Sequence, residues 1–294
     1  MMDIGYYPGC SQEGTAKEYD KSIRAILKVL DVNPVELDDW SCCGATSAHV
    51  TNHKLALALS ARNLALAEKQ NLKELFAPCA ACFSRLALTQ CELKSDSNLK
   101  TEIEDIIENK LNGTTEVINI IELFKKLGSD KIKANRKVEL KGLKAACYYG
   151  CLLVRPHEIN GYDDAEMPTS MEDIVKATGA ETIEWNFKTE CCGAAHSIPR
   201  VDIVIDLSKK ILDDAKKHGA NVMVVACPMC HNNLDLRQKL IKREYKSHED
   251  IPVLYLSEFI GLSLGFSQKE LGIDTHYIKF EMPELKKKES EVTV

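Results

Sequence analysis

Short apolar runs alternate with longer amphipathic segments along most of this 294-residue chain. Runs of strand length occupy residues 3–8, 35–40, 72–77, 143–149, 181–185 and 222–226. Apolar residues recur at helical spacing in the segments between them, at residues 15–30, 50–70, 171–178 and 201–218. Strand and helix in alternation predict a parallel sheet with helices packed on its faces, which is the α/β class.

Four short motifs of the chain occur twice, in the same order. Each second copy follows the first by 136 to 149 residues. The pairs are GYYPGC with CYYGC, SCCGA with ECCGA, FAPCAAC with VACPMC, and VINIIELF with VLYLSEFI. A duplication of this kind predicts two tandem, pseudo-symmetric, Rossmann-like α/β domains, each with its own parallel sheet.

The boundary between the two domains is expected in a polar part of the chain. We expect the first domain to cover residues 1–135 and the second to cover residues 136–282. The lysine-rich stretch 128–141 is expected to link them. Residues 283–294 form a charged tail, which we expect to be disordered or to become ordered only against a partner.

Charge and hydropathy exclude some function classes. The chain has 38 lysines and arginines against 44 aspartates and glutamates, a net charge of −6, whereas nucleic-acid-binding surfaces are usually basic. No apolar run approaches the roughly 18 residues that span a bilayer, and the first residues, MMDIGYYPGC, lack the basic and apolar regions of a secretory signal. We therefore expect a cytoplasmic protein with no membrane span and no nucleic-acid partner.

Ten of the twelve cysteines follow the repeat. In each half a single cysteine precedes a Cys-Cys-Gly, which in turn precedes a C-x-x-C segment. The first interval is 31 residues in the first half and 39 in the second, and the next interval is 35 and then 34 residues. The ten are Cys10, Cys42, Cys43, Cys79, Cys82, Cys151, Cys191, Cys192, Cys227 and Cys230.

The predicted fold gathers these cysteines. Each group of them comes soon after a predicted strand, and ligands of open parallel sheets collect beyond the carboxyl ends of the strands. The five cysteines of each half should therefore lie along one edge of its sheet. Gly44 and Gly193, directly after the Cys-Cys pairs, fit a site where the backbone adopts a positive φ or approaches a bulky group.

Three kinds of chemistry use cysteines in such numbers. Structural zinc takes four ligands, usually from two C-x-x-C-like segments, whereas each half offers one such segment and three further thiols. A C-x-x-C that opens a helix also suits a reactive dithiol, but that mechanism has no use for the other three cysteines. Iron–sulfur clusters are held by cysteine thiolates, and adjacent cysteines can ligate different irons of one cluster. The pattern favours an iron–sulfur site, with zinc and a dithiol as alternatives.

The doubled pattern resembles the tandem CCG domains in the B subunit of heterodisulfide reductase from methanogens, over essentially the whole chain. The resemblance implies that each set of five cysteines holds a noncubane [4Fe–4S] cluster. It also implies a substrate, the mixed disulfide of coenzyme M and coenzyme B, which binds between the two clusters and is reduced to two thiols in methanogenesis. CCG domains also occur in complexes that oxidise lactate, glycolate or glycerol-3-phosphate and in fumarate reductases, so an electron-transfer subunit of an organic-acid dehydrogenase is the alternative.

The resemblance further implies partner subunits. The chain has no C-x-x-C-x-x-C-x-x-x-C-P run of the ferredoxin type, so it should receive electrons from another chain. In the family that chain is a ferredoxin-like iron–sulfur subunit, which is supplied by a flavin-containing subunit together with a hydrogenase or formate dehydrogenase.

Basic residues near the second set of cysteines are candidates for binding the anionic groups of such a substrate or for supplying a proton. They are Arg155, His157, His196 and His231. The equivalent positions of the first half, such as Gln12 and Phe83, are not basic, so we expect the substrate to bind asymmetrically. Cys91 and Cys147 lie outside the repeat. Cys91 is expected to be structural. Cys147, four residues before Cys151, is an alternative ligand, but the repeat pairs Cys10 with Cys151.

Overall fold

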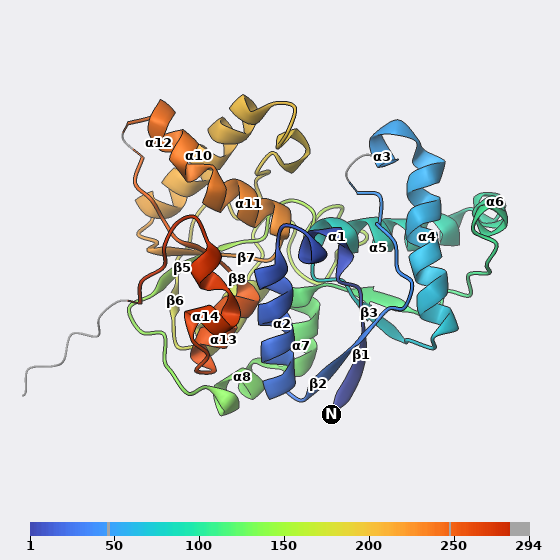
Figure 1. The fold of residues 1–294 in the computed structure, drawn as a ribbon, viewed down its shortest axis with the longest axis horizontal. Coiled ribbons are helices and arrows are strands. Elements are labelled where there is room, and N and C mark those ends of the chain that lie inside the picture. The colour runs from blue at the N-terminus through green and yellow to red at the C-terminus, as the bar shows by residue number, and fades with distance from the viewer. Residues whose placement is uncertain (46–47, 247, 283–294) are drawn as a thin grey trace, which may run out of the picture.

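The computed structural model describes residues 1–45, 48–246 and 248–282, and it contains two α/β units that lie side by side (Figure 1). Each unit is built on a four-stranded parallel sheet, and the two sheets have the same strand order. The predicted α/β class and the predicted duplication are therefore confirmed. The expected charged tail, residues 283–294, lies outside the described residues.

The first unit has the strand order β2-β1-β3-β4. Its strands are β1 (Met2–Tyr6), β2 (Val32–Glu36), β3 (Glu74–Phe76) and β4 (Glu116–Ile118). Chain connections leave in opposite directions from β1 and β3, and open α/β sheets bind their ligands at the carboxyl ends of the strands beside such a point. The single cysteine follows β1 and the C-x-x-C segment follows β3, so both lie at that point.

The second unit repeats this topology with the order β6-β5-β7-β8. Its strands are β5 (Lys144–Tyr148), β6 (Glu181–Thr182), β7 (Val222–Val225) and β8 (Val253–Tyr255). The switch point now falls between β5 and β7, whose last residues Tyr148 and Val225 are paired in register. Cys151 and Cys227 follow these two strands, as Cys10 and Cys79 follow β1 and β3.

The helices lie between and around the two sheets (Figure 1). Those of the first unit are α1 (Gly9–Glu13), α2 (Lys17–Val29), α3 (Ala48–Thr51), α4 (His53–Lys69), α5 (Ala80–Ser95), α6 (Ser97–Ile107), α7 (Ile120–Leu127) and α8 (Ser129–Asn135). Those of the second are α9 (Ser170–Ala177), η1 (Ala194–His196), α10 (Val201–Lys217), α11 (Pro228–Leu236), α12 (Gln238–Glu244), α13 (Leu256–Ser263), α14 (Gln268–Leu271) and η2 (Ile273–Thr275). Within the described ranges, no helix combines the length and the apolarity needed to cross a bilayer.

Two expected strands differ from the observed ones. The strand expected at 35–40 is β2, which ends at Glu36 because the chain turns through Asp39, whose φ is 56°. The strand expected at 181–185 is β6, which has only two residues. The chain then leaves the sheet and buries Trp185, whose indole N–H donates to the Cys147 carbonyl at 3.2 Å. The strands β4 and β8 lie in the fourth repeated motif, for which the sequence pattern predicted no strand.

The polar stretch 128–141, which we expect to link the two domains, is packed against the rest of the structure. It contains α8, and the side chains of Ile132 and Leu140 are fully buried. The backbone N–H groups of Lys137 and Val138 both donate to the Ser263 carbonyl, at 2.8 and 2.9 Å. Two apolar residues and these hydrogen bonds pack the stretch against the second unit, in spite of its many lysines.

The two units contact each other through equivalent helices. The helix before the second strand of each unit packs on the helix after the last strand of the other, α2 on α13 and α9 on α7. The repeated motifs VINIIELF and VLYLSEFI supply the latter helices, and both begin with the same cap. The carboxylate of Glu122 accepts from Asn119 N–H at 3.0 Å, and that of Glu258 accepts from Tyr255 N–H at 2.9 Å. The duplication is thus preserved in the interface as well as in the sheets.

Candidate metal centres

The structure brings the five predicted cysteines of each half to the carboxyl edge of their sheet. In the first unit Cys10 lies in α1, the Cys42–Cys43 pair lies in the loop after β2, and Cys79 and Cys82 lie at the start of α5. The second unit holds its cysteines at the same points, after β5, after β6 and at the start of α11. All twelve cysteines are free thiols. We refer to the two groups as the first and second cysteine sets.

Sulfur atoms from distant parts of the chain contact each other within each set. Cys43 Sγ lies 3.3 Å from Cys82 Sγ, and Cys192 Sγ lies 3.5 Å from Cys230 Sγ. These four thiols are buried. Cys10 is the most exposed cysteine of the first set, and Cys191 is the most exposed cysteine of the second. Each set therefore has a buried inner side and an outer side at the surface.

A buried tyrosine lies at the centre of each set. The Tyr7 hydroxyl donates to Ser41 O at 2.7 Å, and the Tyr148 hydroxyl donates to Glu190 O at 2.6 Å. Each carbonyl belongs to the residue before the Cys-Cys pair. Burial is the main cause that raises the pKa of each tyrosine. The charges of four nearby cysteines of the same set raise it further. Each tyrosine therefore fixes the loop that carries the Cys-Cys pair.

Backbone N–H groups point at sulfur after both pairs. Gly44 N–H donates to Cys42 Sγ at 3.4 Å and Gly193 N–H donates to Cys191 Sγ at 3.3 Å. These glycines have φ values of 77° and 79°, which L side chains rarely adopt. Hydrogen bonds to ligand sulfur are one of the ways in which proteins tune iron–sulfur centres. The predicted requirement for glycine after each pair is thus explained by a turn that aims an amide at a thiol.

A second pair of glycines passes directly over sulfur. A Cβ on Gly9 would lie 3.0 Å from Cys82 Sγ, and a Cβ on Gly150 would lie 3.2 Å from Cys230 Sγ. Both residues precede the single cysteine of their set. The backbone therefore approaches the C-x-x-C segment closely at the same point of both units, which leaves no room for a side chain.

The C-x-x-C segments begin helices whose N-terminal ends face the cysteine sets. Cys79 is the N-cap of α5, and Cys227 is the N-cap of α11. The positive end of a helix dipole and its free N–H groups favour thiolate over thiol. Hydrogen bonds from Cys230 and Cys79 lower the pKa of Cys227 well below its usual range, and the N–H groups of the first turn add to the effect.

Other thiols of the sets are also inclined to lose their protons. Hydrogen bonds from Cys42 and Cys82 lower the pKa of Cys43. A hydrogen bond from Cys151 lowers the pKa of Cys191 to about 6, with smaller contributions from Gly193 N–H and the charge of His196. Metals bind the thiolate form, so each set contains at least one cysteine that is disposed to ligate near neutral pH.

The two sets meet at the boundary between the units. Cys79 and Cys227 lie near enough for each thiol to shift the pKa of the other: Cys227 raises the pKa of Cys79, and Cys79 lowers that of Cys227. These residues are equivalent in the duplication, and each opens the C-x-x-C helix of its own unit. The two sets therefore approach each other where the pseudo-symmetry relates one set to the other.

The donor chemistry of each set fits an iron–sulfur cluster. Five cysteines converge, backbone amides donate to sulfur, and the inner side is closed to water, which are the features by which proteins hold and tune such clusters. Among the described residues, no three or more histidine, cysteine, aspartate or glutamate side chains are arranged with the geometry of a metal-ion site. The fit thus rests on the type and grouping of the donors.

The four basic residues predicted beside the second set lie in different surroundings. Arg155 donates to Thr189 Oγ1 at 3.2 Å, two residues before Cys191, and to both oxygens of Glu166 at 2.9 and 3.0 Å. His196 ends η1 and is exposed next to the second set. His157 is exposed in the loop that follows Cys151. Three of the four are thus at or near the outer side of the second set.

His231 lies behind the second set, in the core. Its Nε2 is 3.0 Å from Val253 O, and its ring stacks on Tyr255 with centroids 4.2 Å apart. Burial lowers the pKa of His231 well below its ordinary value, so its ring is neutral. In this position the side chain supports α11 from the sheet side.

Acidic side chains line a cavity beside the first set. A cavity of about 570 Å³ reaches Cys42 and is lined by carboxylates, a tryptophan and the backbone before the pair. Its acidic residues are Glu13, Glu36, Asp38 and Asp39. Acidic side chains therefore border the first set, whereas the second set has Arg155, His157 and His196 nearby together with the acids Glu166 and Glu190.

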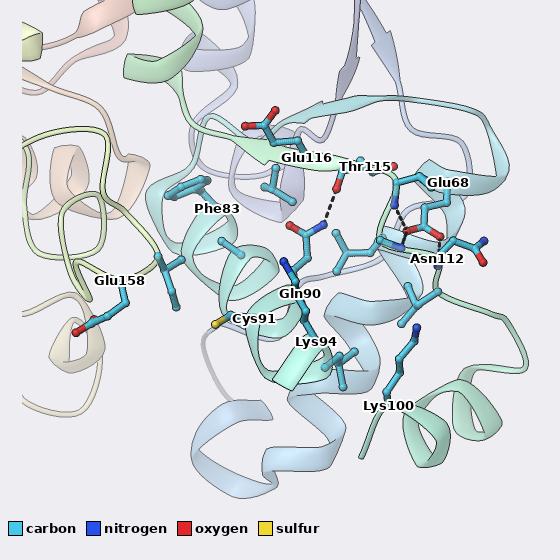
Figure 2. Close-up of a pocket in the computed structure, with 18 of the residues that line it drawn as sticks. Glu68, Phe83, Gln90, Cys91, Lys94, Lys100, Asn112, Thr115, Glu116 and Glu158 are labelled. Atoms are coloured by element: carbon cyan, nitrogen blue, oxygen red, sulfur yellow. Dashed lines mark hydrogen bonds between the residues drawn. The ribbon is translucent and has the colours of Figure 1, made fainter. Parts of the chain in front are cut away.

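The two cysteines outside the repeat stand apart from the sets. Cys147 is buried in β5, paired with Val224, and its carbonyl accepts from Trp185. Cys91 lies on α5 and lines a second cavity of about 680 Å³, which none of the ten repeated cysteines borders (Figure 2). Phe83, next to Cys82, lines the same cavity, and Glu158 borders it from the second unit (Figure 2).

Sequence reasoning missed several residues that organise the sets. Tyr7 and Tyr148 occupy the same place in the repeated GYYPGC and CYYGC motifs, and this repetition was a signal. Asn233 donates to Cys192 O at 3.1 Å and lies 3.6 Å from Cys192 Sγ, but it has no counterpart in the motifs. Tyr19, whose hydroxyl lies near both C-x-x-C segments, gave only the signal of a helix face.

Comparison with known proteins gives one family model for both units. The model for a cysteine-rich domain, CCG, matches residues 4–87 and again residues 145–235. The two matches contain the first and second cysteine sets respectively. The tandem CCG pattern inferred from the sequence is thereby confirmed.

Curated relatives match over nearly their whole length. The chain is 35% identical to the 8-methylmenaquinol:fumarate reductase membrane anchor subunit of Wolinella succinogenes, over 95% of this chain and 98% of that protein. It is 32% identical to the B subunit of the Ferredoxin/F(420)H(2)-dependent CoB-CoM heterodisulfide reductase of Methanosarcina acetivorans, over 95% of both chains. The B subunit of the Ferredoxin:CoB-CoM heterodisulfide reductase of Methanosarcina mazei is 31% identical, also over 95% of both.

A solved structure shares the fold. A hypothetical protein from Helicobacter pylori superposes with a TM-score of 0.76 at 12% sequence identity. The match covers 95% of this chain and 52% of that one, so the chain spans about half the length of the solved protein. At this level of identity the likeness concerns the architecture alone.

Proposed function

Because this chain belongs to the family of tandem cysteine-rich CCG domains that includes the B subunit of heterodisulfide reductase, we propose that it is the disulfide-reducing subunit of such an enzyme. Its substrate would be the mixed disulfide of coenzyme M and coenzyme B, reduced to two thiols in methanogenesis. The ligands would be Cys10, Cys42, Cys43, Cys79 and Cys82 for one noncubane [4Fe–4S] cluster and Cys151, Cys191, Cys192, Cys227 and Cys230 for the other.

The closeness of the two C-x-x-C segments carries this proposal: the Tyr19 hydroxyl lies 3.2 Å from Pro78 O and 3.5 Å from Ala226 O, and these two residues directly precede Cys79 and Cys227. Reduction of a disulfide consumes two electrons and two protons and yields two thiols, whereas an iron–sulfur centre usually transfers one electron. Two centres that share one substrate resolve this mismatch, and they must lie close together. Cys79 and Cys227, equivalent cysteines of the two sets, lie close to the same phenol at the unit boundary and support that arrangement.

The side chains around the sets have separate tasks in this reaction. Bound clusters would supply the electrons, one from each. Tyr7 and Tyr148 hold the loops of the Cys-Cys pairs in place through their hydrogen bonds to Ser41 and Glu190. The N–H groups of Gly44 and Gly193 donate to ligand sulfur and so stabilise negative charge there.

Substrate recognition would use the basic side of the molecule. Arg155, His157 and His196 lie where they can pair with sulfonate, phosphate or carboxylate groups, and a histidine can give its proton to a departing thiolate. The carboxylates beside Cys42 repel such groups. The anionic ends of the substrate would therefore approach from the second set. His231, buried and neutral, would act through its support of α11.

Electrons would come from other chains of a complex. In this proposal a ferredoxin-like iron–sulfur subunit delivers them from a flavin-containing subunit with a hydrogenase or formate dehydrogenase, and the complex is cytoplasmic. The relatives named as B subunits of heterodisulfide reductases support an assembly of this kind.

A second candidate function is favoured by one relative. The chain is 35% identical to a protein named as the membrane anchor subunit of 8-methylmenaquinol:fumarate reductase. An electron-transfer subunit of an organic-acid dehydrogenase or reductase would use the same two centres without a disulfide substrate. The acidic surroundings of the first set suit this alternative, because they do not attract an anionic substrate.

Iron analysis and a disulfide-reduction assay on anaerobically purified protein distinguish the two proposed functions. Both proposals expect about eight iron atoms and a similar amount of acid-labile sulfide per chain. Only the first expects thiol production from the coenzyme M–coenzyme B disulfide with a reduced dye as electron donor. Iron-loaded protein that is inert toward the disulfide would establish the alternative, and folded protein that takes up no iron would contradict both.

A further inference from the structure

Tyr19 is a fully buried residue of α2, a helix that lies at the boundary between the two units (Figure 1). Its hydroxyl lies 3.2 Å from Pro78 O and 3.5 Å from Ala226 O. Pro78 immediately precedes Cys79, and Ala226 immediately precedes Cys227. A single phenol thus contacts the backbone that leads into both C-x-x-C segments, one from each unit.

The ring of Tyr19 is held by a stack of aromatic side chains. Tyr255, at the end of β8 in the second unit, stacks on it with centroids 4.1 Å apart and planes 15° apart. His231 in turn stacks on Tyr255 at 4.2 Å, and it directly follows Cys230. The stack fixes the position of the phenol relative to the second unit, while α2 fixes it relative to the first.

This arrangement is not a by-product of the duplication. The counterpart of α2 is α9, whose third residue is Glu172 where α2 has Tyr19. The carboxylate of Glu172 binds Lys188 at 2.5 Å within the second unit. In the repeated motif Asn119 stands where the second unit has Tyr255. The phenol and its stack therefore occur once in a molecule that is otherwise pseudo-symmetric.

We propose that Tyr19 is a positioning residue that fixes the spacing of the two C-x-x-C segments and, with it, the distance between the two metal centres. This inference rests on the proposed function, since only a protein that uses both centres together needs their spacing held. A shift of either segment would separate the hydroxyl from one of its two carbonyls. Misplacement of reacting groups by about 1 Å can cost roughly a hundredfold in rate.

Ser22 provides a matched control for this role. It lies one turn further along α2, is equally buried, and its Oγ is 2.7 Å from Ser257 Oγ in the second unit. That bond joins α2 to α13 without reaching either C-x-x-C segment, and Ser22 Oγ also donates to the Tyr19 carbonyl within α2 at 2.9 Å. A residue that merely holds the units together should behave like Ser22.

The test compares Tyr19→Phe with Ser22→Ala in iron-loaded protein. Tyr19→Phe keeps the ring and its stack and removes the hydroxyl. We expect amide hydrogen exchange in residues 79–83 and 227–231 to become roughly three- to tenfold faster in both segments together, as loss of one hydrogen bond allows. The magnetic interaction between the two centres, measured by electron paramagnetic resonance, should change while the iron content does not. Disulfide reduction should fall about tenfold or more.

Ser22→Ala should leave exchange in those two segments at the wild-type rate. Equal acceleration in both variants, or none in Tyr19→Phe, would overturn the positioning role. These outcomes are separate from the proposed function. If the wild type carries both centres and reduces the disulfide while Tyr19→Phe leaves exchange and magnetic interaction unchanged, the Tyr19 inference alone fails. If the wild type binds no iron, the proposed function fails and the positioning role with it.

Discussion

The sulfur atoms of Cys43 and Cys82 lie 3.3 Å apart, although 39 positions separate the two residues in the sequence. Their counterparts Cys192 and Cys230 are 38 positions apart and lie at 3.5 Å. The same contact therefore forms twice, from different loops, and both copies are buried. The loops that carry these cysteines differ in length between the two units, but the contact between the sulfur atoms is the same. The duplication has therefore kept the arrangement of the sulfur atoms.

Replacement of one cysteine in a set should remove one centre and leave the other. We expect Cys192→Ser to lower the iron content from about eight to about four atoms per chain and to abolish disulfide reduction, since one remaining centre supplies one electron. Cys43→Ser should do the same through the first set. Iron analysis and a thiol-release assay check this expectation. Cys91→Ser, outside the repeat, should keep both values, and a Cys192→Ser protein with full activity would contradict the two-centre reaction.

The close approach of Gly150 to Cys230 should make this glycine hard to replace. A Cβ there would lie 3.2 Å from the sulfur, and the φ of 66° adds backbone strain. We expect Gly150→Ala to cost about 2–3 kcal/mol in free energy of unfolding and to lower iron occupancy of the second centre. Urea unfolding and iron analysis measure the two effects.

Gly113 is the matched control for this prediction. Its φ is 71°, but no atom would lie within 4 Å of an added Cβ. Gly113→Ala should therefore cost only the conformational strain, about 1 kcal/mol, with full iron content. Equal losses in the two variants would mean that the sulfur contact has no role.

The repeated motifs made the cysteine sets predictable. Parallel strands end at a common edge, so cysteines that follow successive strands had to converge whatever the details of packing. Gly44 and Gly193 were predictable for a different, local reason. Both have a positive φ, and glycine directly after a repeated Cys-Cys pair indicates such a conformation. Motifs that occur twice also identified β4 and β8 as equivalent, although not as strands.

Contacts between units were not predictable in this way. Tyr19 lies 59 and 207 positions from the carbonyls that its hydroxyl contacts, and helical spacing indicated only that it faces a core. His231 was assigned to the pocket because it follows Cys230. On an α-helix successive residues are rotated by about 100°, and this turn directs its ring to the core, against Tyr255.

The buried ion pair of Lys188 and Glu172 should be essential for the second unit. Their side chains are 1% and 2% exposed and lie 2.5 Å apart, and the Lys188 carbonyl accepts from both Tyr149 and Gly150 just before Cys151. Lys188→Met leaves a buried carboxylate without its cation, which we expect to cost about 3–5 kcal/mol in free energy of unfolding.

Two variants test whether burial is the cause. Lys54→Met, which breaks the exposed pair with Glu102, should cost at most about 1 kcal/mol. The double change Lys188→Met with Glu172→Leu should recover part of the loss, because neither charge is then buried alone. Urea unfolding of the four proteins provides the comparison, and a Lys188→Met protein as stable as Lys54→Met would refute it.

Stability should depend on pH through the pair of His276 and Glu258. His276 Nε2 lies 3.0 Å from Glu258 Oε1, and both side chains are buried. Burial lowers the His276 pKa, but the hydrogen bond and charge of Glu258 outweigh it, so the net shift is upward. Burial likewise raises the pKa of Glu258. A group whose pKa is raised in the folded state stabilises the fold fully below its unfolded pKa, and this contribution is lost as pH rises through the folded pKa.

The pairing itself acts on the two pKa values in opposite directions, since Glu258 raises the pKa of His276 while His276 lowers that of Glu258. We expect the difference in free energy of unfolding between the wild type and His276→Gln to be largest where His276 is protonated and Glu258 is ionised, and to shrink as the pH rises above about 6.5, the ordinary pKa of histidine. Urea unfolding at several pH values gives this difference directly. Because Tyr277 and Ile278 also bond to Asp235, the variant keeps the C-terminal segment attached, so the comparison isolates the charge. A difference that stays constant or grows with pH would show that the imidazole contributes by packing alone.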